Sequence, residues 1–250
     1  MEKTMKFTKK FVQTMAGLIL TAASSQAGLT PVQDIWGANG AGGEWNLYNS
    51  GVGSSQGAGI MEYVYGAGEF TRVDDSSDIL WAGLNGGATF DAVYAGASQA
   101  LYTAAPAGSP TSTEILGVPG GNSGAPSRSS SIVNYTPISQ PFLFLDEANG
   151  NNAYSDPSLS SGGVDRMVTF AVNGYLATPG NAATYTPFSD ATTHYVIAFE
   201  DGTDFDYNDL VVEVSGVSPV PEPTTLISGA LMMLPFGAGL ARALRRKMVA

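Results

Sequence analysis

The chain has 250 residues, of which 22 are acidic and 11 are Lys or Arg; it contains one His and no Cys, and its formal net charge is −11 at pH 7. Without cysteine there are no disulfides, and with a single histidine a zinc site of the usual ligand types is not expected. The acid excess disfavours binding to nucleic acid and to anionic lipid, and it favours cations.

Residues 1–27 are typical of a secretory signal peptide. A lysine-rich start precedes a short apolar run from Phe11 to Ala23, and Ser25 and Ala27 place small side chains at positions −3 and −1 of a cleavage site after Ala27. About a dozen apolar residues are too few to cross a bilayer, so a cleaved leader is expected rather than an anchor.

Short apolar or alternating runs separated by turn-rich stretches follow, and long helical periodicity is absent. Val168, Phe170 and Val172 alternate on one face, as expected for a β-strand. We therefore predict one all-β domain, a β-sandwich or jelly roll, over residues 28–214. The runs are residues 59–66, 69–73, 78–83, 88–96, 99–103, 131–135, 140–147, 166–172, 194–200 and 209–214.

Residues 105–131 are rich in Gly, Ser and Pro and are predicted to form a long surface loop, with a linker between two β subregions as the alternative. Within them, GGNSGAP is superficially similar to the nucleophile loop of trypsin-like proteases. However, Asn122 and Ala125 replace an Asp and a Gly of that loop, and the only histidine, His194, follows Ser123 instead of preceding it. A protease is therefore not predicted.

Two further patterns have simpler structural explanations. Adjacent acids such as Asp146 and Glu147 point to opposite faces of a strand, so they are poor partners for a glycosidase. Several aromatic residues could line a sugar-binding face, but we expect most of them to fill the core; they are Trp36, Trp45, Tyr48, Tyr63, Tyr65, Trp81, Tyr94 and Tyr102.

Acidic residues gather between the last two predicted strands, with no Lys or Arg nearby in the sequence. Gly202 permits a sharp turn, and Phe205 and Tyr207 alternate with polar residues, so these two rings are expected to point into the core. Like charges about 4 Å apart repel by roughly 1 kcal/mol in water and about 4 kcal/mol in a shielded site. A divalent cation would relieve this repulsion, and calcium binds six to eight oxygens.

We therefore expect a calcium site at this turn, with a solvated turn that binds no ion as the alternative. The D-x-D-x-N spacing also begins an EF-hand loop, but Asp209 and Ser215 stand where that loop needs Gly and Glu. The candidate ligands are Glu200, Asp201, Asp204, Asp206, Asn208 and Asp209.

The stretch AFEDGTDFDYNDLVVEV, residues 198–214, resembles the F-E-D…D-x-D-x-N-D signature of a domain of unknown function in exported bacterial proteins. Residues 142–172, with Tyr-Ser-Asp-Pro at 154–157, fit the same family, so the resemblance covers about residues 140–214. It implies a β-sandwich-like fold, a calcium site near the acidic turn that Asp156 also approaches, and no known catalytic activity. Relatives often carry a longer Gly-rich insert where this chain has Gly202-Thr203.

The C-terminal region has three parts after a predicted linker at residues 215–223. Pro221, Glu222 and Pro223 precede an uncharged stretch, residues 224–241, that is long enough for a membrane helix. A basic tail, residues 242–250, contains Arg242, Arg245, Arg246 and Lys247, which would stay in the cytoplasm. This order resembles the PEP-CTERM sorting signal and implies cleavage by an exosortase in a Gram-negative bacterium that makes extracellular polysaccharide; a plain C-terminal anchor is the alternative.

These features predict an exported, non-enzymatic protein of the cell surface or extracellular matrix that is stabilised by calcium. Residues 28–220 contain three arginines, no lysine and 20 of the acidic residues, a formal charge of −17, so nucleic acid is not an expected partner. A carbohydrate-binding module for extracellular polysaccharide is the alternative, and a hydrolase is a remote one.

Overall fold

The computed structural model describes residues 45–47, 59–83, 86–106, 112–134, 138, 140–202 and 206–220. The predicted signal peptide (1–27), sorting motif (221–223), apolar span (224–241) and basic tail (242–250) lie outside the described residues. Within the described ranges, no helix is long and apolar enough to cross a membrane.

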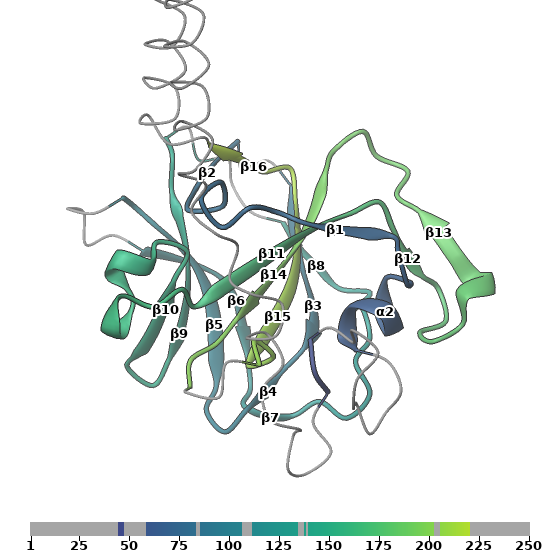
Figure 1. The fold of residues 1–250 in the computed structure, drawn as a ribbon, viewed down its shortest axis with the longest axis horizontal. Helices are drawn as coiled ribbons and strands as arrows, with labels where there is room; N and C mark the ends of the chain where they lie inside the picture. Colours follow the sequence, from purple (N-terminus) through teal and green to yellow (C-terminus); the bar gives the residue numbers. More distant parts are fainter. Residues whose placement is uncertain are drawn as a thin grey trace, which may run out of the picture.

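Two antiparallel sheets form most of the described structure (Figure 1), so the all-β prediction is confirmed. The larger sheet has the order β1 (Phe70–Arg72), β11 (Met167–Val172), β14 (His194–Phe199), β15 (Leu210–Ser215), β3 (Gly87–Ala92) and β8 (Ile132–Asn134). The smaller sheet has the order β10 (Asn151–Tyr154), β9 (Leu143–Ala148), β5 (Gln99–Ala104) and β6 (Ser112–Val118).

Short elements complete the fold. Three two-stranded pairs are β12 (Gly174–Leu176) with β13 (Tyr185–Pro187), β16 (Ser218–Val220) with β2 (Leu80–Ala82), and β4 (Tyr94–Ala95) with β7 (Gly121–Asn122). The described helices are α2 (Ile60–Val64) and the single 3-10 turns η2 (Pro157–Leu159), η3 (Ser161–Gly163) and η4 (Ala182–Thr184).

The larger sheet is buried on both faces. Ile197, Phe199 and Val212 pack towards the smaller sheet in one core, whereas Val196 and Val211 pack in a second core with α2. The central strands β14 and β15 therefore read as continuous apolar runs, as expected for strands covered on both sides. Val168, Phe170 and Val172 lie together in the second core, which confirms the predicted face of β11.

Residues 60–64, which were expected in a strand, form the helix α2. The Glu62 side chain accepts a hydrogen bond from the Gly59 backbone N–H at 3.0 Å, so it caps the helix start. Ile60, Met61 and Val64 are fully buried at helical spacing. In so short a segment, the alternating and the helical patterns cannot be told apart from sequence.

The segment 105–131 is not simply a surface loop. Residues 112–118 form β6, which pairs with β5 in the smaller sheet and buries Ile115 and Val118. The predicted linker at 215–223 also begins inside the fold, because Ser218–Val220 pairs with β2. β6 was not recognised as a strand from the sequence, because the residues around it are rich in glycine and serine. Its pairing with β5 stabilises it.

Candidate functional site

The connection between β14 and β15 closes one end of the two packed sheets, and Glu200 organises it. The Glu200 side chain is fully buried, and its Oε2 accepts the backbone N–H groups of Asp206 at 3.0 Å and Tyr207 at 3.3 Å. Tyr207 adopts φ 53°, is 1% exposed and donates its hydroxyl to the Asp165 carbonyl at 2.8 Å. The prediction that Tyr207 anchors in the core is confirmed, while Asp204 and Phe205 lie outside the described residues.

Asp206 and Asn208 are also buried, at 4% and 1% exposure. Asn208 Nδ2 donates to the Trp45 carbonyl at 2.9 Å and to Asp206 Oδ2 at 2.6 Å. Asn208 therefore ties the turn to Trp45 and is itself bonded to Asp206. The alternative of a fully solvated turn does not hold for Asp206 and Asn208, because both are buried and have the hydrogen bonds that a buried polar group requires.

Asp201 and Asp209 face the smaller sheet. The Asp201 backbone N–H donates to Asp209 Oδ2 at 2.7 Å, and Gln99 of β5 donates from Nε2 to Asp201 Oδ2 at 2.6 Å. The acidic turn is thus joined to the neighbouring sheet by a side chain that sequence reasoning had not singled out. Asp156, which was expected near this end, caps η2 by accepting the Ser158 N–H at 2.9 Å, and no contact of a described residue links it to the turn.

Asp146 is the unexpected member of this end of the molecule. It lies on β9 opposite Leu101 and is 0% exposed, whereas its neighbour Glu147 is exposed. In the described part of the chain, neither Asp146 oxygen has a partner in hydrogen-bond geometry, and neither does Gln99 Oε1. Burial raises the pKa of Asp146 well above its usual value, and the charges of Asp201 and Asp209 raise it further, while the Ala100 backbone offsets part of the effect.

A signal for Asp146 was present in the sequence. Phe144 and Asp146 are two residues apart on a strand, so an aspartate occupies the face that buries a phenylalanine. We refer to Gln99, Asp146, Asp201 and Asp209 as the cross-sheet acidic site, because it joins the smaller sheet to the β14–β15 turn.

The chemistry of the cross-sheet acidic site suits a hard cation, because all its unsatisfied atoms are oxygens. The described residues do not complete a shell, however: among them, no three His, Asp or Glu side chains lie together closely enough to hold a metal ion. Arg166 also donates to the Gly202 carbonyl, so a cationic group that the sequence had not placed near the turn lies beside it.

A second cluster of charges lies on the opposite face of β15, around Glu213. Arg128 donates two hydrogen bonds to this carboxylate, from Nε at 2.5 Å and from Nη2 at 2.8 Å. His194 Nδ1 lies 2.8 Å from Glu213 Oε1. The Tyr65 hydroxyl lies 3.1 Å from Glu213 Oε2 and 2.7 Å from Asp91 Oδ2. We call Tyr65, Asp91, Arg128, His194 and Glu213 the charge network.

The charge network shifts the pKa values of Glu213 and His194 in opposite directions. Burial raises the pKa of Glu213, but hydrogen bonds from Arg128 and His194 outweigh it and leave the pKa lowered. Burial lowers the pKa of His194, but its bonds to Glu213 and Asp190 outweigh this and leave it raised. Both His194 nitrogens face carboxylates, since Nε2 lies 2.8 Å from Asp190 Oδ1, and this arrangement favours the doubly protonated imidazolium.

The charge network does not have the arrangement of a hydrolase or a protease. Both Glu213 oxygens are already taken by Arg128, His194 and Tyr65, so they are not available to a substrate. Ser123 accepts a hydrogen bond from the Val93 N–H at 2.8 Å, whereas both ring nitrogens of His194 face carboxylates, so His194 is not placed to act as a base for Ser123.

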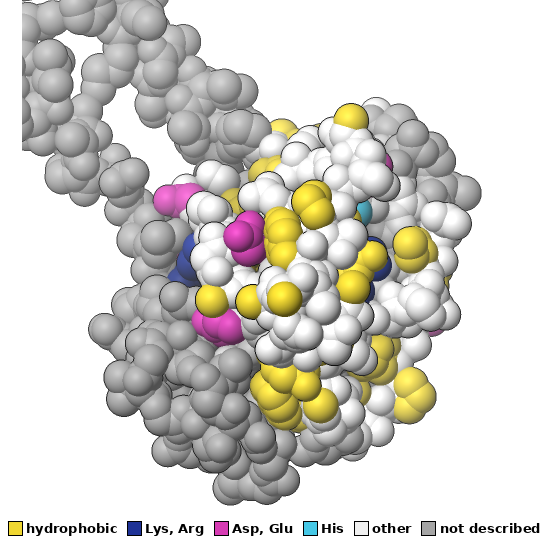
Figure 2. All heavy atoms as spheres, turned by 90° about the vertical axis from the view of Figure 1, so that its right-hand side faces the viewer, with side chains coloured by type: hydrophobic (Ala, Val, Ile, Leu, Met, Phe, Trp, Pro, Cys, Tyr) yellow, Lys and Arg dark blue, Asp and Glu magenta, His cyan; other side chains and the backbone are white. Residues whose placement is uncertain are grey.

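Many of the acids are inside the protein. On the face that Figure 2 presents, acidic side chains lie singly among polar and apolar ones and do not gather into one patch. The buried carboxylates are Asp78, Asp91, Asp146, Glu200, Asp206, Asp209 and Glu213. Many of the acidic residues behind the formal charge of −17 were expected at the surface but lie in the interior.

Comparisons with known proteins add little. No protein-family model matches the chain, and no curated protein matches it. Among solved structures, the C-terminal domain of BC2L-C lectin from Burkholderia cenocepacia is similar, with a TM-score of 0.30 and 16% identity, over 58% of this chain and 97% of the lectin domain. At this TM-score the similarity supports no inference about fold or function.

Proposed function

We propose that the protein is an exported, non-enzymatic component of the cell surface or extracellular matrix, and that a calcium ion stabilises its cross-sheet acidic site. The observation that carries the calcium proposal is Asp146, a fully buried carboxyl group near Asp201 and Asp209 to which no side chain of the described residues donates a hydrogen bond. A buried charge of this kind is costly unless it is paired or binds a metal.

The expected ligands are the oxygens of Asp146, Asp201, Asp209 and Gln99, with Asp204 as a further candidate from the turn. Because no three acidic side chains of the described residues already lie close enough together to hold a metal ion, these side chains would have to move towards the calcium when it binds. Glu200, Asp206 and Asn208 are assigned instead to holding the turn, because they bond to backbone and to each other. This revises the ligand set expected from sequence. Bound calcium would supply charge neutralisation between the two sheets and would have no catalytic role.

Thermal unfolding of the full-length chain, followed by Trp fluorescence, tests the calcium proposal. With calcium at 100 times its dissociation constant, we expect the native state to gain about 2.7 kcal/mol over the same protein in chelator. Asp146→Asn should abolish this gain. Glu147→Gln, the same kind of change at the exposed neighbouring residue, should retain it. Equal melting temperatures of the wild type in millimolar calcium and in chelator would refute the proposal.

The sorting proposal rests on sequence alone and can be tested in cells. Glu222→Ala, or replacement of Arg242, Arg245 and Arg246, is expected to leave the protein uncut at the inner membrane, since it removes one part of the three-part signal. Immunoblots of membrane and extracellular fractions would show the larger, unprocessed form. Normal processing of both variants would contradict a PEP-CTERM signal.

The alternative, carbohydrate binding, keeps only part of the support it had in the aromatic residues. Trp45, Tyr65, Trp81 and Tyr94 are buried in the cores.

A further inference from the structure

The segment 188–193 joins β13 to β14 beside the charge network. Residues 189–193 are all exposed, and among the described residues no backbone hydrogen bond links them to another segment. Side chains tie the segment to His194 instead. Phe188 stacks on the His194 ring, with the two centroids 3.7 Å apart and the planes 7° apart, and both oxygens of Asp190 lie close to His194 Nε2, at 2.8 and 3.0 Å. Beyond Phe188, the contact of Asp190 with His194 therefore holds this exposed segment to the protein.

The other nitrogen of the His194 ring faces the interior. Nδ1 lies 2.8 Å from Oε1 of Glu213, and the same carboxylate accepts hydrogen bonds from Arg128 and Tyr65. Glu213 is 2% exposed, whereas the Asp190 side chain is 48% exposed. The ring thus has a fixed inner partner and an outer partner that can move into water.

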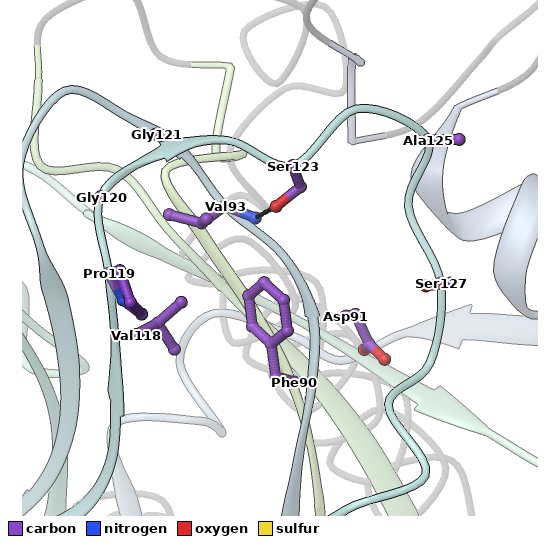
Figure 3. A pocket seen from close by; sticks show the side chains of 10 residues that line it. All are labelled: Phe90, Asp91, Val93, Val118, Pro119, Gly120, Gly121, Ser123, Ala125 and Ser127. Atoms are coloured by element: carbon purple, nitrogen blue, oxygen red, sulfur yellow. Dashed lines mark hydrogen bonds between the residues drawn. The ribbon is translucent and has the colours of Figure 1, made fainter.

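The backbone around Arg128 keeps the inner partner in place. The N–H groups of Ser127 and Ser129 donate to the carbonyls of Asp91 and Phe90 at 3.2 and 2.8 Å. Figure 3 shows the segment that ends at Ser127 passing over β3, with Ser127 and Asp91 on the same side of the strand. Arg128 is therefore held against Glu213 whatever the segment 188–193 does.

The two contacts of the ring require a proton on each nitrogen. An imidazolium donates from both nitrogens, whereas a neutral imidazole donates from one and accepts at the other. When the ring loses a proton, the remaining N–H stays with Glu213, because that carboxylate is buried and cannot turn to water. Nε2 then directs a lone pair at the Asp190 carboxylate, so an attraction becomes a repulsion. The stack with Phe188 also loses its cationic partner.

Several elements contribute charge around the His194 ring. Its cross-strand neighbours Val172 and Ser215 are uncharged. The charged and titratable groups near it, directly or through Glu213, are Asp190, Glu213, Arg128, Tyr65, Asp91 and Tyr175. Glu213 keeps Arg128 as its counter-charge when the ring is neutral, so the loss of the proton removes the partner of Asp190 alone.

We propose that the segment 188–193 is a pH-operated latch, which the His194 imidazolium closes through Asp190 and Phe188 and which the neutral ring releases. Burial lowers the pKa of His194, but its bonds to Glu213 and Asp190 outweigh this and leave it above the ordinary value of about 6.5. The latch is therefore closed at pH 6.5 and below, and it opens as pH rises through the folded value. A hydrogen bond from Thr192, together with that from His194, lowers the pKa of Asp190, so Asp190 stays charged throughout this range.

Two probes in the full-length chain test the latch. His194 is the only histidine, so NMR of an untagged protein with 13C-labelled histidine follows its titration alone. The chain has no cysteine, so Ala191→Cys places a single spin label on the exposed segment, and EPR measures the mobility of the label. Between about pH 5 and about pH 10, we expect the label to lose its immobilised component with the same midpoint as the His194 signals, above about pH 6.5.

Three variants locate the effect. Asp190→Ala removes the outer partner of the ring, so it should leave the label mobile at every pH and lower the His194 midpoint. Ser189→Ala, at the exposed residue before it, is the matched control and should behave like the wild type. A label on Ala183→Cys, at an exposed alanine of η4 outside the latch, should show no transition at the His194 midpoint.

Any of four results would overturn the latch: constant mobility of the Ala191 label over the whole pH range, a mobility change with a midpoint unlike that of His194, the same mobility change in Asp190→Ala, or a His194 midpoint that Asp190→Ala leaves unaltered. Calcium is kept in excess throughout, and neither His194 nor Asp190 belongs to the cross-sheet acidic site. The outcome is therefore independent of the calcium and sorting proposals.

Discussion

Replacing Glu213 with Gln is expected to lower the free energy of unfolding by about 3–5 kcal/mol, because it removes the buried anion that pairs with the half-buried Arg128 and the buried His194. Glu213 is 2% exposed, Arg128 binds it through two nitrogens, and His194 donates to it from Nδ1. In the variant, Arg128 and the imidazolium would face an amide that cannot neutralise them. Urea unfolding followed by Trp fluorescence, with Trp81 in the core, measures the change.

Two further variants keep this prediction falsifiable. Glu114→Gln makes the same substitution at an exposed carboxylate that also accepts a Tyr hydroxyl, from Tyr102 at 3.3 Å, and should change stability by less than about 0.5 kcal/mol. The double variant Arg128→Met with Glu213→Gln should lose less stability than the sum of the two single variants, because the uncompensated charge is removed. Strict additivity would mean that the two side chains do not stabilise each other.

Without calcium, Asp146→Asn is expected to be more stable than the wild type near neutral pH, by about 2 kcal/mol. The wild type must there either bury an unpaired carboxylate or take up a proton to neutralise it, and both cost free energy, whereas an amide carries no charge. With calcium the order should reverse, because the variant loses an anionic ligand. Urea unfolding in chelator and in calcium gives both differences for the same pair of proteins.

The stability advantage of Asp146→Asn over the wild type in chelator is expected to increase with pH. Burial raises the pKa of Asp146 in the folded protein, so its contribution to stability is present below the unfolded pKa of about 3.9 and is lost as pH rises through the folded value. In chelator, the advantage of Asp146→Asn should therefore vanish near pH 4 and grow with pH. Glu147→Gln should show no such trend. If Asp146→Asn were less stable than the wild type in chelator at neutral pH, the carboxylate would have a stabilising partner other than calcium.

Much of the fold could be predicted from local pattern. Strands β9, β11, β14 and β15 carry the period-two or continuous apolar residues expected of them, and these patterns depend only on neighbours along the chain. The helix α2 and strand β6 could not be predicted in this way. A five-residue helix has no repeated turn to show its period, and β6 depends on its pairing with β5.

The candidate site, like the fold, could be predicted from the sequence only in part. The sequence placed Glu200, Asp201, Asp206, Asn208 and Asp209 in one turn, because they are neighbours in the chain. It did not separate Glu200, which binds backbone N–H groups of the turn, from Asp201, which faces the smaller sheet. The different roles of Glu200 and Asp201 depend on which core each residue of the turn adjoins, and this is decided by the tertiary structure.

The sequence by itself determined the all-β class and the acidic turn between the last two long strands, because each follows from alternation and spacing within a few residues. It also placed Tyr207 in the core, but not for the reason expected, because Tyr207 is not extended and its neighbours Asp206 and Asn208 are buried as well. Only the tertiary structure brought Asp146 and Gln99 to that turn, and only it joined Tyr65, Asp91 and Arg128 to Glu213. The physical reason is distance along the chain: Gln99 and Asp201 are 102 residues apart, and Tyr65 and Glu213 are 148 apart, so no local pattern records their contact.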